Sequence, residues 1–324
     1  MLGNPIQTKH PVLLLSVVLP LAFLLTIAIS AQSVVAAESD FIGRWNLSLL
    51  DVDGYASAWL EIRPTADQDK RGQLVWIFGG AEPIEDVVIA EDVLTFSHFF
   101  MGKRLRFTAR PAGNALTGTT TDHSSTIKWV GVRAPDLRPP TMLRQDTPLA
   151  IMTGPTLSGW TLRNGSSPSC WHTEEGILFN DQSCADLKSN LDFLNFHLKL
   201  EFRLDDEGGS GVYLRGRYEV QIANDGNGPP TSRSSGAIFG HLAPLLSAGK
   251  KPGEWQTLEV TLIGREVTVR LNHHVVIANE QIPGPTGAAL DSDEGQPGPI
   301  MLQGDHGRVS FRNIVITPLI QDTP

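Results

Sequence analysis

The chain repeats one pattern that restricts its fold strongly: short segments in which apolar and polar residues alternate one by one. In His197–Leu204, the apolar residues Leu198, Leu200, Phe202 and Leu204 alternate with charged or polar ones. Such alternation places the apolar side chains together on one face of a β-strand. Helical spacing is hard to find in the 324 residues, and 31 glycines and 22 prolines supply many turns. We therefore expect an all-β protein.

Residues 38–133 contain about eight segments of this kind, separated by turn signals such as Asp53-Gly54 and Gly79-Gly80. Their short, regular spacing predicts a small antiparallel β-barrel. The opening Gly43-Arg-Trp45 resembles the start of lipocalin-like barrels, in which the tryptophan closes one end. No catalytic constellation stands out here, so we interpret residues 38–133 as a lipocalin-like accessory domain.

A proline-rich stretch, residues 134–146, follows as a stiff linker. Residues 147–320 form a second strand-rich unit with longer alternating segments. One apolar face on each strand predicts two curved sheets packed face to face, a jelly-roll sandwich.

The first 37 residues differ from the rest. Lys9-His10 precedes a run without charged residues over 11–30, and Val35 and Ala37 provide small residues for cleavage. This arrangement is typical of a signal peptide, residues 1–37, and predicts a secreted or periplasmic protein. The run over 11–30 is also long enough to span a bilayer, so an uncleaved membrane anchor is the alternative.

The net charge disfavours one class of partner, and the two cysteines raise the question of a disulfide. The formal net charge of −9 argues against nucleic acid, which needs basic patches. Cys170 and Cys184 flank a segment that looks like a hairpin. A disulfide and two free thiols both remain open here.

Candidate site residues come from two stretches. In Gly209–Ile222, read as one strand, a single face carries polar side chains that are costly to bury without a partner or ligand. This face consists of Tyr213, Arg215, Arg217, Glu219 and Gln221. The second stretch places Asp305 and His306 between glycines, just before another alternating strand. Polar strand faces plus a loop histidine indicate a carbohydrate groove.

Sugar rings could stack on Trp160, Trp171 and Trp255, although burial in the core is the favoured reading for each.

The second unit resembles the 3-keto-disaccharide hydrolase domain family over its whole length. The residues that carry this resemblance include Leu157-Ser-Gly-Trp160, Ser210–Gly216, Tyr218–Ile222, Gly253-Glu-Trp255 and Leu302-Gln-Gly-Asp-His-Gly307. The sequence departs from the family at Gly209, Gln256 and His273, where Asn, Asn and Gly are usual. The resemblance implies a concanavalin/glucanase-like jelly roll, and the two-unit arrangement looks like that of exported bacterial members.

The resemblance also implies an activity, cleavage of glycosides oxidised to a ketone at carbon 3. The ketone acidifies the hydrogen on carbon 2, so a base can remove it, the glycosidic oxygen leaves, and water adds back. Such a site needs a base, an acid for the leaving group, and a donor or cation for the enolate.

Roles can be assigned on this basis. Glu219 and His306 would serve as acid and base, in either order. Arg215 would bind the ketone or enolate oxygen. Pairing with Arg215 or Arg217 would keep Glu219 ionised. The expected substrate contacts are Gln221, Arg217, Glu201, Gln303, Asp305 and Tyr213. We expect no cofactor, with a divalent cation bound by Glu219 and His306 as an open alternative.

Two other functions stay open. A carbohydrate-binding or adhesion module would need the groove but no acid or base. An ordinary retaining glycosidase needs two carboxylates about 5 Å apart. The polar strand holds Glu219 alone, which disfavours this second alternative.

Overall fold

The computed structural model describes residues 38–52, 54–65, 67, 71–122, 124–152, 156–166, 170–205, 208–225 and 228–321. The predicted signal peptide, residues 1–37, and its alternative as an anchor over 11–30 lie outside these residues. Within the described ranges, no helix is both long and apolar enough to cross a membrane.

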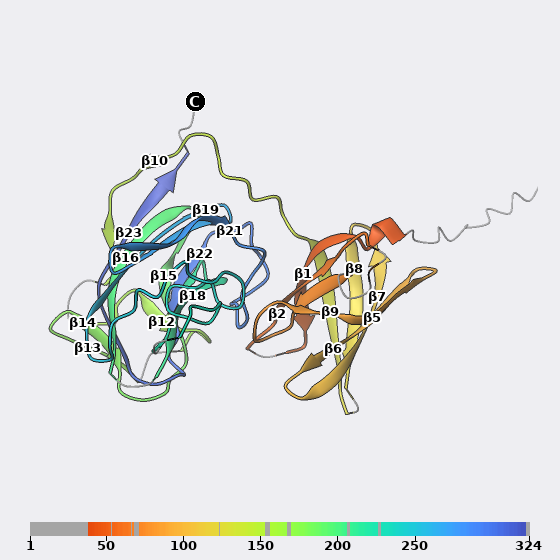
Figure 1. Cartoon of the computed structure of the whole chain (residues 1–324), viewed down its shortest axis with the longest axis horizontal. Helices are drawn as coiled ribbons and strands as arrows, with labels where there is room; N and C mark the ends of the chain where they lie inside the picture. The colour runs from red at the N-terminus through yellow and green to blue at the C-terminus, as the bar shows by residue number, and fades with distance from the viewer. Residues whose placement is uncertain are drawn as a thin grey trace, which may run out of the picture. The chain divides into compact units, whose positions relative to one another are not determined.

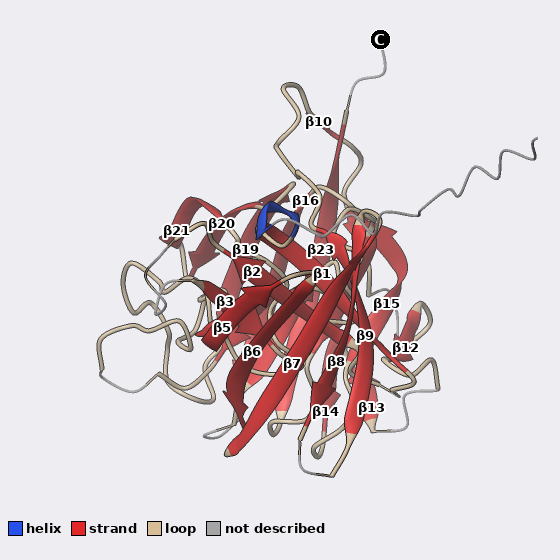
Figure 2. Ribbon diagram, turned by 90° about the vertical axis from the view of Figure 1, so that its right-hand side faces the viewer, coloured by secondary structure: helices blue, strands red, loops and turns tan. Residues whose placement is uncertain are grey.

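The described chain is built from β-strands, and a short 3-10 turn, η1 (Glu38–Asp40), is the helical element among these residues (Figure 2). The predicted all-β class is therefore confirmed. The alternating segments recognised in the sequence form strands because they bury one face and expose the other. β16 shows this clearly, with Leu198, Leu200, Phe202 and Leu204 buried.

Nine strands of the first half form one antiparallel sheet, coloured orange to yellow in Figure 1. They are β1 (Gly43–Leu50), β2 (Ser57–Ile62), β3 (Gly72–Val75), β4 (Glu82–Pro83), β5 (Glu85–Ala90), β6 (Val93–Phe100), β7 (Lys103–Ala112), β8 (Ala115–Thr121) and β9 (Thr126–Arg133). The order in the sheet is β4-β3-β2-β1-β9-β8-β7-β6-β5. Its two edge strands, β4 and β5, are separated only by Ile84. The segment from Glu82 to Ala90 thus pairs with β3 at its start and β6 at its end.

This continuity nearly closes the sheet into a barrel, as the sequence predicts. Its core is apolar and includes Trp45, Leu60, Trp76 and Phe107. The indole Nε1 of Trp45 donates to the Phe41 carbonyl at 2.9 Å. The barrel therefore has its own hydrophobic interior.

The second half forms two packed sheets, shown in green to blue in Figure 1. The larger sheet contains β10 (Arg144–Gln145), β11 (Leu149–Ala150), β13 (Trp171–Glu174), β14 (Ile177–Asn180), β16 (Phe196–Leu204), β19 (Gln256–Ile263), β20 (Glu266–Leu271), β21 (His274–Gln281) and β23 (Val309–Ile320). The smaller sheet contains β12 (Trp160–Leu162), β15 (Leu187–Phe193), β17 (Ser210–Leu214), β18 (Tyr218–Ile222) and β22 (Gly298–Leu302). A second apolar core fills the space between these sheets. This is the predicted jelly-roll sandwich. β10, at the end of the stretch predicted as a linker, pairs with the last residues of β23.

One sequence interpretation is wrong in its local detail. Gly209–Ile222 is not a single strand but a hairpin, with β17 and β18 joined by a turn at Arg215, Gly216 and Arg217. Arg215 and Gly216 have φ angles of 54° and 68°, in the left-handed region that a tight turn uses. The hairpin pairs Tyr213 with Glu219 directly, so both side chains still lie on one face.

Candidate active site

A cavity of about 440 Å³ lies against the face of hairpin β17–β18 that carries Tyr213 and Glu219. Six of the predicted site residues line it: Tyr213, Glu219, Gln221, Gln303, Asp305 and His306. They come from the hairpin and from the loop between β22 and β23. The cavity therefore brings together both stretches that the sequence singled out.

Glu219 lies in the wall of this cavity with 3% of its surface exposed. Its backbone N–H donates to Thr286 Oγ1 at 3.0 Å, which anchors β18 to the neighbouring loop. A Cβ on Gly211, in the facing strand, would lie 2.2 Å from Glu219 Oε1. Glycine at this position therefore leaves the space that the carboxyl group occupies.

Burial raises the pKa of Glu219 to about 8, and the charges of Asp186 and Asp305 act in the same direction. A hydrogen bond from Tyr213 opposes this increase in pKa. The expectation that Arg215 or Arg217 pairs with Glu219 and keeps it ionised is wrong. The raised pKa favours the protonated carboxyl group at neutral pH, because among the described residues no arginine forms a salt bridge with Glu219 and the charge of Arg233 only partly offsets its loss of hydration.

The contacts of Tyr213 are compatible with a protonated Glu219, although its hydrogen bond favours the ionised form. Its hydroxyl lies 3.0 Å from Glu219 Oε2 and 3.3 Å from the Gly287 carbonyl oxygen. A phenol has one proton, so it cannot donate to both oxygens at once. A protonated Glu219 removes the conflict, since the acid then donates to Tyr213 and Tyr213 donates to Gly287.

Asp186 is a second buried acid of the cavity, and the sequence analysis missed it. It precedes β15, where no strand alternation marks it. The Gly304 N–H donates to its Oδ1 at 3.3 Å, and Arg163 lies 3.6 Å from its Oδ2. Burial, followed by the charge of Asp305, raises the pKa of Asp186 to about 6. In the sequence, the proximity of Asp186 to Cys184 was the one feature that could have pointed to this residue.

Asp305 and His306 lie at the mouth of the cavity on a loop that folds back on itself. His306 Nδ1 is 2.5 Å from Asp305 Oδ1, and both side chains are partly open to solvent. The Gly209 N–H donates to the His306 carbonyl at 2.9 Å. Neighbouring side chains of a strand face apart, so this contact depends on the loop conformation.

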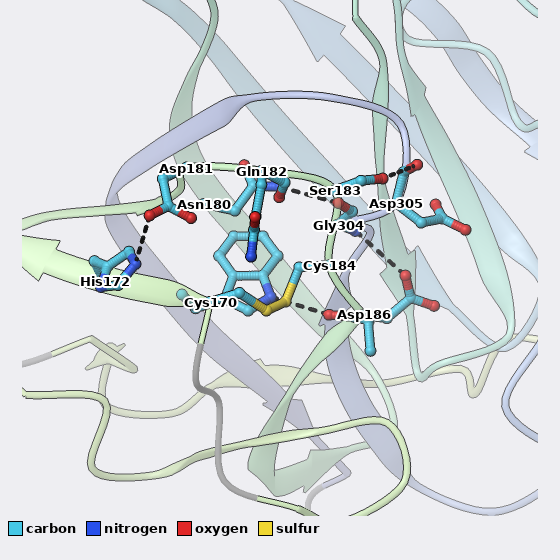
Figure 3. Close-up of a disulfide and its surroundings, with 12 residues drawn as sticks. Cys170, His172, Asn180, Asp181, Gln182, Ser183, Cys184, Asp186, Gly304 and Asp305 are labelled. Atoms are coloured by element: carbon cyan, nitrogen blue, oxygen red, sulfur yellow. Dashed lines mark hydrogen bonds and ion pairs between the residues drawn. A yellow bond between two sulfur atoms is a disulfide. The ribbon is translucent and has the colours of Figure 1, made fainter.

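The hairpin β13–β14 and the segment up to Cys184 contact the loop that carries Asp305 and His306 (Figure 3). The Asn180 side chain donates to the Gly304 and Gly307 carbonyls at 3.0 and 2.9 Å. Cys170 and Cys184 form a disulfide, which settles the choice that the sequence left open. The Cys184 N–H donates to the Gly304 carbonyl at 2.8 Å. The disulfide therefore fixes the segment that carries Asp186 and supports the loop of His306.

Three predicted site residues do not line the cavity. Arg215 is buried in the turn, where its Nη2 donates to the Gly264 carbonyl at 2.6 Å. Arg217 forms a salt bridge of 2.6 Å with Asp291. Glu201 belongs to β16 in the other sheet and forms a salt bridge with Arg312. The two arginines are misplaced by the strand interpretation, because the turn directs them away from the face of Glu219.

The favoured reading of the tryptophans, burial in the core, is confirmed for Trp160 and Trp171, and Trp255 does not line the cavity either. Trp160 and Trp171 are buried, and Trp255 contacts Arg203 and Arg312. The cavity contains other aromatic residues that the sequence analysis missed, namely Tyr55, Phe78 and Phe239. Arg233 also lines it, with its guanidinium 4.9 Å from the centre of the Phe239 ring.

The donor set can be tested for a metal site. Across the described part of the chain, no group of three or more His, Cys, Asp and Glu side chains is arranged to hold a metal ion.

Comparison with known proteins identifies the family. Residues 148–317, just over half of the chain, match the profile of the 3-keto-alpha-glucoside-1,2-lyase-like domain. The chain belongs to this family. The 3-keto-alpha-glucoside-1,2-lyase-like domain covers both sheets of the sandwich apart from β10 and the last residues of β23, and it covers all of the cavity residues that belong to them. It is a carbohydrate-active domain, and the molecules on which such a domain acts are sugars.

Solved structures similar to the 3-keto-alpha-glucoside-1,2-lyase-like domain include bacterial proteins. A candidate glycosyl hydrolase from Parabacteroides distasonis is 25% identical over 55% of this chain and 91% of its own, with a TM-score of 0.47. A second protein of this description from the same organism is 28% identical over 53% of this chain and 100% of its own, with a TM-score of 0.43. LamAcat from Zobellia galactanivorans is 11% identical over 55% of this chain and 97% of its own, with a TM-score of 0.36. No curated protein gives a significant match.

Proposed function

We propose that this domain cleaves the glycosidic bond of 3-keto-glycosides by removal of the carbon 2 proton, elimination and hydration. One observation carries the proposal. A single cavity contains two buried carboxyl groups, Asp186 and Glu219, whose pKa values of about 6 and about 8 lie on opposite sides of neutrality. A pair separated in this way supplies a base and an acid at the same pH.

The reaction balances without an external oxidant or reductant. The base takes the proton from carbon 2, and the bonding electrons move into an enolate whose charge rests on the carbon 3 oxygen. The enolate collapses to restore the ketone, a double bond forms between carbons 1 and 2 as the bond from carbon 1 to the glycosidic oxygen breaks, and the leaving alkoxide receives a proton. Water then adds its hydroxyl to carbon 1 and a proton to carbon 2, which gives the free 3-keto sugar.

The two carboxyl groups divide these proton transfers. Asp186 is mostly ionised at pH 7 and accepts the carbon 2 proton. Glu219 is mostly protonated at pH 7 and protonates the leaving oxygen. Tyr213 holds the Glu219 carboxyl group in place through the contact of 3.0 Å between their oxygens.

Arg233 and His306 complete the proposed site. The Arg233 guanidinium lines the cavity and would stabilise the enolate oxygen, the role that the sequence analysis gave to Arg215. His306, held by Asp305 at the cavity mouth, would pass a proton in the hydration step. Gln221 and Gln303 would contact sugar hydroxyls. The account needs no cofactor, and the chelator arm of the experiment below tests a divalent cation.

The test is turnover of a 3-keto-glucoside and of its unoxidised parent by the purified protein lacking residues 1–37, with and without a chelator. We expect cleavage of the keto sugar alone, and losses of at least a hundredfold in kcat/KM for Asp186→Asn and Glu219→Gln. Glu201→Gln, in the other sheet, is the matched control and should retain activity. Cleavage of both sugars would indicate a glycosidase, and glycan binding without cleavage would indicate a binding module.

We also propose that the protein is exported. The signal-type segment over residues 1–37 and the Cys170–Cys184 disulfide support this, because disulfides persist in oxidising compartments. N-terminal sequencing of the protein secreted by its host should begin near Glu38. A mature chain that still begins before residue 11 would overturn the cleavage and favour the anchor.

A further inference from the structure

The cavity has a wall that does not belong to the sandwich. Tyr55, from the connection between β1 and β2, and Phe78, from the connection between β3 and β4, line it together with Glu219 and His306. These residues lie outside the family match, which begins at residue 148. The described residues from Glu38 onward belong to one compact unit that includes both the barrel and the sandwich.

The wall is aromatic and open to the cavity. The Tyr55 and Phe78 rings pack edge to face with centres 4.7 Å apart. Phe100 stacks behind Phe78, with nearly parallel rings 6.4 Å apart. Phe78 nevertheless leaves 40% of its surface exposed, although it has aromatic neighbours that could have buried it. An exposed ring fixed at the edge of a cavity is a surface on which another ring can stack.

Specific contacts fix this wall in position. The Ala288 N–H donates to the Ile77 carbonyl at 2.7 Å, next to Phe78. A Cβ on Gly287 would lie 2.5 Å from the backbone nitrogen of Gly79, so the two backbones touch and a side chain would force them apart. The Arg163 guanidinium lies 4.2 Å from the centre of the Tyr55 ring and donates to the Ala288 carbonyl at 2.6 Å.

A buried junction between barrel and sandwich extends this attachment. The Trp59 indole donates to the Pro285 carbonyl at 2.8 Å, and the Asn46 amide donates to the Ser292 carbonyl at 2.9 Å. Arg44 forms a salt bridge with the fully buried Glu294, which also accepts a hydrogen bond from Tyr218, the residue before Glu219. The barrel is thus linked through buried polar contacts to the strand that carries the proposed acid.

The two walls differ in chemistry. On the sandwich side, ionisable groups at Asp186, Glu219 and His306 suit the sugar that reacts. The barrel side offers aromatic carbon and backbone. A ring stacks its apolar face on aromatic carbon, whereas a small leaving group such as methanol would leave this wall uncovered.

We infer that Tyr55 and Phe78 form a subsite for the leaving group, selecting glycosides whose leaving group contains a ring with an apolar face. The inference rests on the proposed cleavage of 3-keto-glycosides. It gives the barrel a role in substrate selection without a role in the chemistry. A second sugar and an aromatic aglycone share the required ring.

Three 3-keto-glucosides with methyl, phenyl and glucosyl leaving groups test the inference. Phe78→Ala and Tyr55→Ala should lower kcat/KM for at least one of the two ring-bearing substrates roughly three- to tenfold. The methyl substrate should change less than twofold. The ring-bearing substrate whose kcat/KM falls more identifies the preferred leaving group. Tyr55→Phe keeps the ring and should rescue the loss. Phe99→Ala removes an exposed ring of the same barrel that is outside the cavity, and should change none of the three.

The same variants separate this inference from the proposed function. Dissociation constants of the unreacted glycosides, measured by calorimetry, report the subsite even if the wild-type protein cleaves nothing. Weaker binding of a ring-bearing ligand to Phe78→Ala would then uphold the subsite while the proposed reaction fails. Equal losses for all three leaving groups, no loss for any of them, or no detectable binding and no turnover would overturn the subsite.

Discussion

Tyr213 and Glu219 lie directly opposite each other in hairpin β17–β18, with the tyrosine hydroxyl 3.0 Å from the Glu219 carboxyl group. This pair links the fold to the proposed chemistry. The strand register places both side chains on the cavity face, and burial there raises the pKa of Glu219 to about 8. The same burial that prepares an acid for catalysis costs stability once that acid is ionised.

Glu219→Gln should therefore become more stable than the wild type as the pH rises. A buried acid whose folded-state pKa is raised stabilises the fold below its unfolded pKa, near 4.5, and loses that contribution as the pH rises towards 8. Glutamine does not titrate and avoids this loss. The gain in the free energy of unfolding should grow between pH 4.5 and 8, with an upper bound of roughly 5 kcal/mol. Denaturant unfolding at several pH values measures it, with the exposed Glu280→Gln as control. A constant difference between variant and wild type across this range would contradict the buried, protonated Glu219.

Gly211→Ala should disturb the acid without touching substrate. The new methyl group would lie 2.2 Å from Glu219 Oε1, so the Glu219 side chain or its strand must shift, and the contact with Tyr213 is disturbed. We expect kcat/KM to fall at least tenfold, because a misplaced acid no longer meets the leaving oxygen. Gly228→Ala is the matched control, since a Cβ there meets nothing within 4 Å. Full activity of Gly211→Ala would show that the position of Glu219 is not important.

The dependence of kcat/KM on pH should be bell-shaped. Below about pH 6 Asp186 becomes protonated and cannot accept the carbon 2 proton, and above about pH 8 Glu219 ionises and cannot donate one. Stopped-time assays from pH 4 to 10 give the two limbs. Residual activity of Asp186→Asn should lack the acid limb, and that of Glu219→Gln should lack the basic limb. An unchanged acid limb in Asp186→Asn would transfer the role of base to another group.

Removal of the disulfide should weaken both the fold and the site. Cys170 and Cys184 are 14 residues apart, and closure of a loop of this size stabilises a protein by roughly 3 kcal/mol. The double variant Cys170→Ser/Cys184→Ser should lose about that much free energy of unfolding. Its kcat should also fall, since the bridge braces the segment of Asp186 and the loop of His306. Unfolding in denaturant and turnover at a temperature where the variant is folded separate the two effects. Lower stability with unchanged kcat would limit the disulfide to the fold.

The architecture could be predicted from the sequence because alternation reports burial directly. The regular pattern of His197–Leu204 is the pattern of β16, and the repeated short segments over 38–133 are the barrel strands. Glu219, Tyr213 and Gln221 were placed on one face correctly even though a turn interrupts their stretch. A hairpin in this register pairs odd-numbered positions with odd-numbered ones, so the parity argument holds across the turn.

The rest of the site depends on tertiary structure. Arg215 and Arg217 share the parity of Glu219 but fall in the turn, which alternation cannot reveal. Asp186 lies just before a strand. It reaches the cavity because the Cys170–Cys184 disulfide and the loop at Gly304 hold its segment in place. Tyr55 comes from a different part of the chain altogether. No local pattern records which distant segments meet.

The most direct test of the central claim is deuterium incorporation during cleavage of a 3-keto-glucoside in deuterium oxide. Removal of the carbon 2 proton followed by hydration should give a 3-keto sugar with deuterium at carbon 2, as measured by mass spectrometry and nuclear magnetic resonance. Substrate incubated without protein corrects for spontaneous exchange beside the ketone. The variant Glu201→Gln serves as the active control. Enrichment at carbon 2 that follows product formation is the predicted result. Rapid cleavage with no deuterium at carbon 2 above the protein-free level would contradict elimination.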